Sequence, residues 1–345
     1  MATGLKAFRK IQAGSEGATP GTAVAATEIL YGVLSTYESG ETIHWPEEDR
    51  NSLARHMADD EIVGKEAKIV WAGDLNHRHA NWLLSMAIRG NVTPTQPDGT
   101  NEPNSYLWTY APTLTTANTP DQTNGIETYT IEYGDNLQAY EVEYCFATKL
   151  QISGAPNEVV KFTCDITGRQ RADTTFTSSL TAQSVQRFPF NLATIAIDTT
   201  GAGIGDTAKT GLLRAFTWTL DTMFRAFYTA DGNLYFAVVA EDRKAPELTL
   251  TYVRNSDADT ERTAYENRTT KFLRIALNGQ TEMDESQSNP PYLYLDQAIR
   301  YKEWPTFSDQ DGLATVQVKA DAVYDSTWAK TFECALLTDL STWPT

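Results

Sequence analysis

Cysteine is scarce in this sequence of 345 residues. The three that are present, Cys145, Cys164 and Cys334, are too few and too widely spaced for a disulfide framework or a CxxC zinc motif. We therefore expect all three to be small buried apolar side chains. Long apolar runs are also missing: no stretch reaches the roughly 18 residues of a membrane span, and no signal-peptide apolar segment follows the N-terminus. The sequence predicts synthesis in the cytoplasm without insertion into a membrane.

Basic residues are too few to balance the acidic ones. The chain has 28 lysines and arginines against 45 aspartates and glutamates, which gives a formal net charge of −17. This excess opposes adhesion to nucleic acid, because such adhesion depends on neutralising phosphates. An acidic surface would instead let a duplex pass without sticking, although solubility alone also explains the charge. Hydrophobic residues make up 41% of the chain, which indicates a folded protein rather than a disordered one.

The sequence has no complete catalytic or nucleotide-binding motif. Residues 201–210 differ by one position from the phosphate-loop pattern, but Ala208 replaces the glycine that lets the backbone curl round a phosphate, and Asp206 adds a negative charge. The residues that follow alternate like a strand, so the helix that should bind the phosphate is missing. Neither a Gly-x-Ser-x-Gly elbow nor a Cys–His arrangement is present. We expect no enzyme and no cofactor.

Metal-binding patterns are incomplete as well. His77 and His79 form an HxH pair without a third ligand at a recognisable spacing, and we interpret them as surface histidines, like His44 and His56 elsewhere. The acidic residues at 257–261 and 309–312 lack the terminal glutamate of a calcium loop. The first group is better explained as the acidic start of a helix. The sequence therefore predicts no metal site.

Alternation of apolar and polar residues predicts a mainly β protein. Residues 128–133 and 140–144 have this period, with many threonines, tyrosines and valines. An Asp-Gly pair between two β-rich segments predicts a hairpin over residues 227–236. Two stretches differ, residues 79–89 and roughly 259–277, because their apolar residues recur at spacings of three and four and a glycine follows each. We expect a helix in each.

These two stretches indicate an internal duplication. Residues 83–90 and 272–279 have the same order of large apolar, small and glycine positions. A strand-like segment precedes each, at residues 67–71 and 247–252. A repeated unit of strands plus one helix explains this order, although a chance match stays open. The join would lie near residues 183–190.

The N-terminal segment carries a more specific signal. Residues 10–27 contain Gly-Ser-Glu, at positions 14–16, followed by Gly-Thr-Ala-Val-Ala-Ala-Thr at positions 21–27. This segment resembles the opening of tail tube proteins, also called major tail proteins, of long-tailed, siphovirus-type bacteriophages. The rest of the chain resembles that family in the order of its elements more than in its residues. The resemblance covers nearly the whole chain.

The resemblance implies two tandem tail-tube-type β-barrels, β-sandwich-like, each with a flanking helix, at residues 1–185 and 186–345. It implies a structural virion protein that assembles with itself into stacked rings, a hollow tube through which phage DNA is delivered without specific binding. The length fits the duplicated form, in which a homotrimer makes a pseudo-hexameric ring. If the duplication is wrong, the ring would be hexameric and the extra length a decoration domain. Further implied partners are the tape measure protein and the tail terminator and baseplate proteins.

Two groups of charged residues follow as candidate sites. In the family the long loop after the first strands reaches the adjacent ring, which corresponds here to residues 39–65. Its charged candidates are Glu47, Glu48, Asp49, Arg50, Asp59 and Asp60. Acids on alternating strand positions are candidates for the channel lining, where repulsion would keep DNA centred: Glu127, Glu132, Glu141 and Glu143.

One alternative function stays open. Eight tryptophans and 16 tyrosines on a β scaffold would suit a carbohydrate-binding virion protein, for receptor binding or decoration. Paired acids such as Asp221 and Glu241 would be needed for a glycosidase, and their spacing does not indicate one. Aromatic residues that alternate along strands more often form a core or a subunit contact. We therefore favour the tail tube interpretation.

Overall fold

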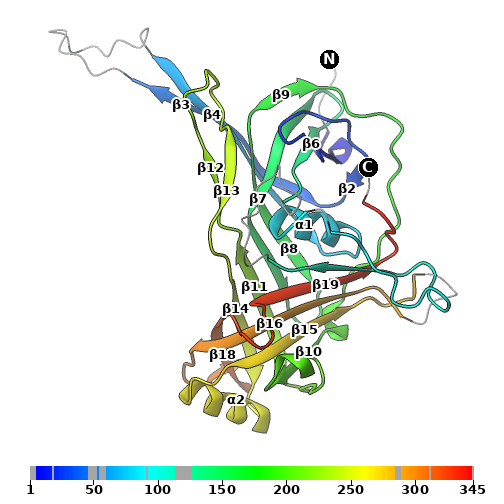
Figure 1. Ribbon diagram of the computed structural model, residues 1–345, viewed down its shortest axis with the longest axis vertical. Helices are drawn as coiled ribbons and strands as arrows, with labels where there is room; N and C mark the ends of the chain where they lie inside the picture. The colour runs from blue at the N-terminus through cyan, green and yellow to red at the C-terminus, as the bar shows by residue number, and fades with distance from the viewer. Residues whose placement is uncertain are drawn as a thin grey trace.

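The computed structural model describes residues 5–17, 19–45, 53, 60–90, 92–112, 126–283, 289–310 and 312–343. Strands dominate both halves of the chain, and each half has one α-helix (Figure 1). The first half contains β1 (Lys10–Ser15), β2 (Glu28–Leu30), β3 (Val33–His44), β4 (Glu61–Asp74), α1 (His79–Ala87), β5 (Tyr106–Tyr110), β6 (Tyr129–Gly134), β7 (Ala139–Gly154), β8 (Lys161–Gly168) and β9 (Arg171–Thr174). The second contains β10 (Thr194–Asp198), β11 (Leu213–Asp221), β12 (Phe224–Phe227), β13 (Val238–Glu241), β14 (Pro246–Val253), α2 (Ser256–Glu266), β15 (Lys271–Asn278), β16 (Tyr292–Glu303), β17 (Ser308–Gln310), β18 (Leu313–Ala322) and β19 (Phe332–Thr338). The prediction of a mainly β protein is confirmed.

The strands join in one sheet that does not close. Seventeen strands are linked by antiparallel pairs, while β12 and β13 form a separate two-stranded sheet. Among the described residues these pairings form no circle, so neither half is a closed barrel within the single chain. The expectation of tandem closed barrels is therefore corrected to an open sheet. Among the described residues, β3 pairs with β4 along one edge only, and the end of β16 pairs with β18 on one side only.

Two junctions connect the halves. β11 of the second half pairs with the C-terminal part of β7, with Leu220 opposite Leu150 and Trp218 opposite Ile152. β19 pairs with β5 of the first half, with Leu336 opposite Trp108. The paired side chains are buried, so the halves share one hydrophobic core instead of each enclosing its own.

Two long hairpins have the same spacing between their paired residues. Val33 pairs with Ala72 in the β3–β4 hairpin, and Leu213 pairs with Tyr252 in the β11–β14 hairpin. Each residue of the first pair thus corresponds to the residue 180 positions later in the second pair. The second hairpin continues into β12 and β13, where Phe227 pairs with Val238 on either side of the Asp-Gly turn. The predicted hairpin is confirmed, with a longer loop than expected.

The first predicted helix is confirmed and the second is partly wrong. Every residue of α1 is buried. α2 begins after Asn255, whose side-chain oxygen accepts a hydrogen bond from Ala258 N at 2.9 Å, and it ends at Glu266. Residues 271–278 form the strand β15 between β10 and β16. Burial on both faces gives such a central strand a nearly continuous apolar run, which sequence periodicity confuses with a helix.

This error also changes the alignment of the proposed repeat. Residues 83–90 lie in and after a helix, whereas residues 272–279 lie in and after a strand, so their pairing is wrong. A displacement of 180 residues instead places α1 over α2. The strand segments at 67–71 and 247–252 already have this displacement, and both belong to the corresponding strands β4 and β14.

The core contains the largest side chains of the protein. Trp71, Trp82, Trp108 and Trp218 are each no more than 1% exposed. All three cysteines are buried and free, as predicted. No helix among the described residues is long and apolar enough to cross a membrane.

Candidate assembly surfaces

The outer part of the β3–β4 hairpin projects from the body of the protein (Figure 1). We call this part, residues 40–65, the arm. Ile43 and Ile62 face each other across the two strands and are 37% and 40% exposed. Exposed cross-strand apolar pairs are unusual on a hairpin that faces water and are typical of contact surfaces. The arm is therefore a candidate assembly element.

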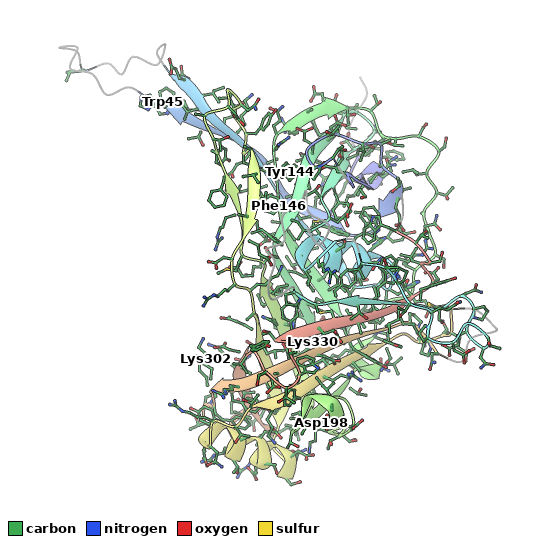
Figure 2. All side chains as sticks on the ribbon, viewed as in Figure 1. Trp45, Tyr144, Phe146, Asp198, Lys302 and Lys330 are labelled. Atoms are coloured by element: carbon green, nitrogen blue, oxygen red, sulfur yellow. The ribbon has the colours of Figure 1, made fainter. Side chains whose placement is uncertain are left out.

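The second hairpin lies beside the arm but is attached to the body. We call this part, residues 224–241 with β12 and β13, the strut. Phe224, Phe236 and Val239 of the strut are buried against Tyr144 and Phe146 of β7. Figure 2 labels these two β7 residues. They form a small second core, separate from the main one. This contact carries an element of the second half onto the first half.

Arg169 secures the strut. Its guanidinium lies 4.5 Å from the ring centre of Tyr144 and 4.7 Å from that of Tyr235. It also donates hydrogen bonds to the carbonyls of Phe236 at 3.3 Å and Gly21 at 3.1 Å. The tip of the strut reaches the arm itself, where Lys65 N donates to the Leu234 carbonyl at 2.7 Å. One cation thus connects the strut, the body and the N-terminal segment.

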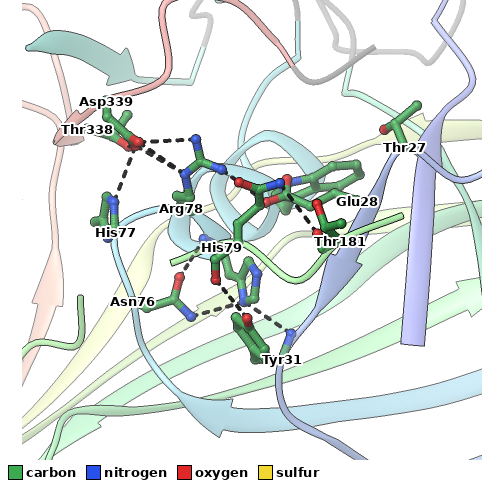
Figure 3. Close-up of polar contacts among 12 residues, drawn as sticks. Thr27, Glu28, Tyr31, Asn76, His77, Arg78, His79, Thr181, Thr338 and Asp339 are labelled. Atoms are coloured by element: carbon green, nitrogen blue, oxygen red, sulfur yellow. Dashed lines mark hydrogen bonds and ion pairs between the residues drawn. The ribbon is translucent and has the colours of Figure 1, made fainter. Parts of the chain in front are cut away.

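A buried polar network fixes the start of α1 to the end of the chain (Figure 3). Arg78 donates from Nε to Asp339 Oδ1 at 3.2 Å and from Nη2 to Asp339 Oδ2 at 3.1 Å. His77 Nε2 lies 3.3 Å from Asp339 Oδ1. Burial alone would raise the pKa of Asp339, but hydrogen bonds from His77 and Arg78 hold that pKa well below its usual range. The carboxylate is therefore charged and anchored.

Glu28 extends the network to β2. Its Oε2 accepts a hydrogen bond from the Trp82 indole at 2.9 Å, and Arg78 Nη1 lies 3.8 Å from its Oε1. Burial raises the pKa of Glu28, and the bonds to Trp82 and Arg78 partly offset this effect. The segment after β19 completes the packing, because Trp343 lies against Trp82, with ring centres 5.4 Å apart, and also contacts Trp108.

The two central histidines are interior, not on the surface. His77 and His79 are 4% and 0% exposed, so the prediction of surface histidines was wrong for this pair. Nδ1 of His79 accepts from Tyr31 N at 3.3 Å and from the Asn76 side chain at 3.0 Å. Burial lowers the pKa of His79 to about 3, so its ring is neutral. The described residues contain no group of His, Cys, Asp and Glu that could hold a metal ion.

Two of the four acids proposed for the channel lining accept hydrogen bonds inside the single chain. Glu127 is buried and accepts hydrogen bonds from the Ser15 hydroxyl and from Gly17 N. Burial raises its pKa. Glu132 is 3% exposed and accepts from Thr177 N at 2.8 Å. Neither side chain is on a free face of the single chain, because each one binds a segment that crosses the sheet.

The other two acids are partly exposed. Glu141 lies opposite Glu132 in the β6–β7 pair, and its side chain is half-buried. Glu143 lies 3.9 Å from Arg169 Nη1, and burial raises the pKa of Glu143. Of the four candidates, these two have the accessibility that a channel lining needs.

Sequence reasoning missed the role of Glu16. Its carboxylate is 3% exposed and accepts hydrogen bonds from Gly21 N at 2.7 Å, Tyr144 N at 2.7 Å and the Thr128 hydroxyl at 2.8 Å. The Gly-x-Glu motif was the available signal. Its glutamate organises the N-terminal segment against the sheet.

Most of the proposed arm charges lie outside the described residues: Glu47, Glu48, Asp49, Arg50 and Asp59. Asp60 is described, directly precedes β4 at the outer end of the arm and is exposed. The arm candidates therefore stay a prediction from sequence.

In the loop that resembles a phosphate site, residues 201–210, two backbone N–H groups and the lysine side chain bind carboxylates of the chain itself. Asp198 accepts from Gly205 N at 2.9 Å and from Thr207 N at 3.0 Å. Lys209 Nζ bonds Asp257, in the first turn of α2, at 3.0 Å. The strand β11 follows, as expected from the sequence. These contacts explain the loop as a structural connection.

Comparison with known protein families gives one match. A family model described as phage tail tube protein matches residues 13–302 of the chain. The match includes the arm, the strut and both helices. No curated protein matches the sequence significantly.

Proposed function

We propose, since the chain belongs to the phage tail tube protein family, that its copies form stacked rings whose hollow centre delivers phage DNA. The protein is a structural component of the virion, and its function is the assembly of a tube. Such a protein needs complementary edges on a single chain. The strand pairings supply the observation that supports this proposal best.

The pattern of strand pairs in the first half recurs in the second. The corresponding pairs have the same order along the chain and the same antiparallel sense. They are β1–β6 with β10–β15, β3–β4 with β11–β14, β4–β8 with β14–β18, β6–β7 with β15–β16, and β7–β9 with β16–β19. We infer two equivalent units, at residues 1–185 and 186–345, related by duplication.

This equivalence indicates how copies join. Within the chain, the end of β7 pairs with β11. The corresponding strands are β16 and β3, and their facing edges have no partner among the described residues. Pairing of the β16 end of one copy with β3 of the next repeats the internal junction, so each copy has one complementary edge of each kind. Head-to-tail contacts of this kind close into rings, and paired edges no longer promote aggregation.

Three copies with two units each would form a pseudo-hexameric ring. Electron microscopy of assembled tubes, with mass measurement of released rings, tests this stoichiometry. Tubes with three chains per ring are expected. Rings of six chains would overturn the duplication, and absence of tubes even with the other tail proteins co-expressed would overturn the tube function.

The remaining features of this function are extensions of the same proposal. Glu141 and Glu143 line the channel, where an acidic surface does not retain DNA by counterion release. The arm contacts an adjacent ring, and the tube ends meet the tape measure, terminator and baseplate proteins. The carbohydrate-binding alternative has less support, because four of the eight tryptophans are buried in the core.

A further inference from the structure

A groove with a basic rim lies between the N-terminal segment and the first sheet. Its volume is about 640 Å³, and it is bordered by the start of β1, the end of β2, the β6–β7 turn and Arg171 of β9. Lys6, Arg9 and Lys10 provide three further cations. Asp135 is the acidic residue among the described lining residues. Its Oδ1 already accepts a hydrogen bond from Leu137 N at 2.8 Å.

The cations of this groove are not neutralised within the subunit. Lys10 Nζ lies 4.2 Å from the ring centre of Phe176, and the Arg171 guanidinium lies 4.6 Å from that of Tyr140. In the described part of the chain, none of the four cations forms an ion pair with a carboxylate. Such a cluster is notable on a chain whose formal net charge is −17. The groove therefore fits an acidic partner.

The floor of the groove also offers apolar surface. Val33 and Leu137 line it and are 56% and 52% exposed. A partner segment that carries apolar side chains between acidic ones would cover both features.

A segment with this composition lies at the end of the arm. Residues 45–61, which include the end of the arm, have six acidic residues and two arginines. The acids form two groups, at 47–49 and 59–61, with Leu53 and Met57 between them. Leu53 is exposed. The described part of the arm leaves the body on the side away from β2, which borders the groove (Figure 1). We therefore expect the acidic segment to meet the groove of another copy and not the groove of its own chain.

We propose that the acidic end of the arm of one copy binds the basic groove of a second copy. This contact rests on the proposed self-assembly and names the surface that receives the arm. The two acidic groups pair with the basic rim, and the apolar residues between them cover Val33 and Leu137. Because most of these charges are near water, salt weakens the contact.

A charge-reversal experiment tests the contact by direct binding. A fluorescent peptide that spans residues 45–61 is titrated with the full-length protein, and its anisotropy is measured. The variant Lys6→Glu/Arg9→Glu should bind at least about tenfold more weakly than the wild type. Arg262→Glu/Arg268→Glu, with Arg262 on α2 and Arg268 just after it, has the same change of charge away from the groove and should bind like the wild type. Equal binding by all three proteins would overturn the proposal.

Assembly gives a second measurement. Lys6→Glu/Arg9→Glu and Glu47→Lys/Glu48→Lys should each lose tubes in electron micrographs, and the fourfold variant that combines them should regain tubes. Loss without regain would overturn direct pairing, as would a groove that binds duplex DNA but not the peptide. If the wild type forms no tubes but binds the peptide through the groove, the tube function fails and the groove contact stands.

Discussion

The arm and the strut are hairpins with the same register, yet only the strut is folded onto the body. The strut buries Phe224, Phe236 and Val239 in the second core. At the positions 180 residues earlier, the arm has His44, His56 and Asp59. Burial of three large apolar side chains stabilises a contact by several kcal/mol in rough terms, whereas burial of a carboxylate without a partner destabilises it. The strut therefore packs on its own chain through an apolar face that the arm lacks.

The strongest test of this comparison removes the strut's largest buried side chain. Phe236→Ala should lower the free energy of unfolding by about 3–5 kcal/mol, because a buried ring leaves a cavity. Chemical denaturation measures the change. Phe227→Ala is the matched control, since Phe227 is 49% exposed in the same hairpin and should change stability by less than about 0.5 kcal/mol. Similar effects of the two variants would contradict the packing contrast.

The stability of the body should depend on pH through the buried His79. The pKa of His79 is lowered to about 3 in the folded protein from an ordinary value of 6.5. Its unfolded form thus binds protons more readily, so stability falls as pH drops below about 6.5, by up to about 1.4 kcal/mol per pH unit. The raised pKa of Glu28 acts in the opposite direction as pH falls.

Comparison of variants isolates the histidine contribution. His79→Gln should flatten the decrease in unfolding free energy between about pH 6.5 and 5. An unchanged slope in His79→Gln would show that another group carries the acid sensitivity.

A smaller effect is expected from the cation that secures the strut. Arg169→Lys retains the charge but loses the planar stacking and the paired backbone bonds, so stability should fall by about 2 kcal/mol. Hydrogen exchange at the amides of residues 234–237 should rise. Arg171→Lys, on the neighbouring strand, is the control for a stacked but exposed arginine. Unchanged exchange in Arg169→Lys would argue that the second core alone holds the strut.

The smallest stability change should come from replacing three polar residues of the arm with the apolar residues at the corresponding positions of the strut. The triple variant His44→Phe/His56→Phe/Asp59→Val should change the free energy of unfolding of the monomer by less than about 0.5 kcal/mol, because the arm projects from the body. Its new apolar face should raise self-association in sedimentation experiments. His44→Gln/His56→Gln/Asp59→Asn is the polar control. If the triple variant stayed monomeric, this result would weaken the claim that an apolar face makes a hairpin pack against another surface.

The strand content, the first helix and the buried cysteines were predictable, because each depends on a local pattern. The second helix was placed wrongly because β15 is buried on both faces, so Phe272 and Ile275 have the spacing of a helix. The 180-residue displacement was visible in the strands before each helix, but the glycines at 90 and 279 directed the alignment elsewhere.

The contacts of the candidate surfaces could not be predicted from the sequence, for a different reason. Arg169, Tyr144 and Tyr235 meet only after the second half folds onto the first. The groove likewise combines Lys6 with Arg171, which no local period connects. His77 and His79 lie at the start of a helix whose every residue is buried, and a hydrophilic sequence pattern gave no sign of that burial.

The packing of Trp343 and β19 against the first half has a consequence for synthesis on the ribosome. β5 lacks its partner strand β19, and Trp82 lacks the neighbouring ring of Trp343, until residues 332–343 have been synthesised. A nascent or truncated chain therefore cannot complete its core, and its first half cannot present finished edges to mature subunits. Synthesis of residues 332–343 therefore precedes any contact that needs the finished first half.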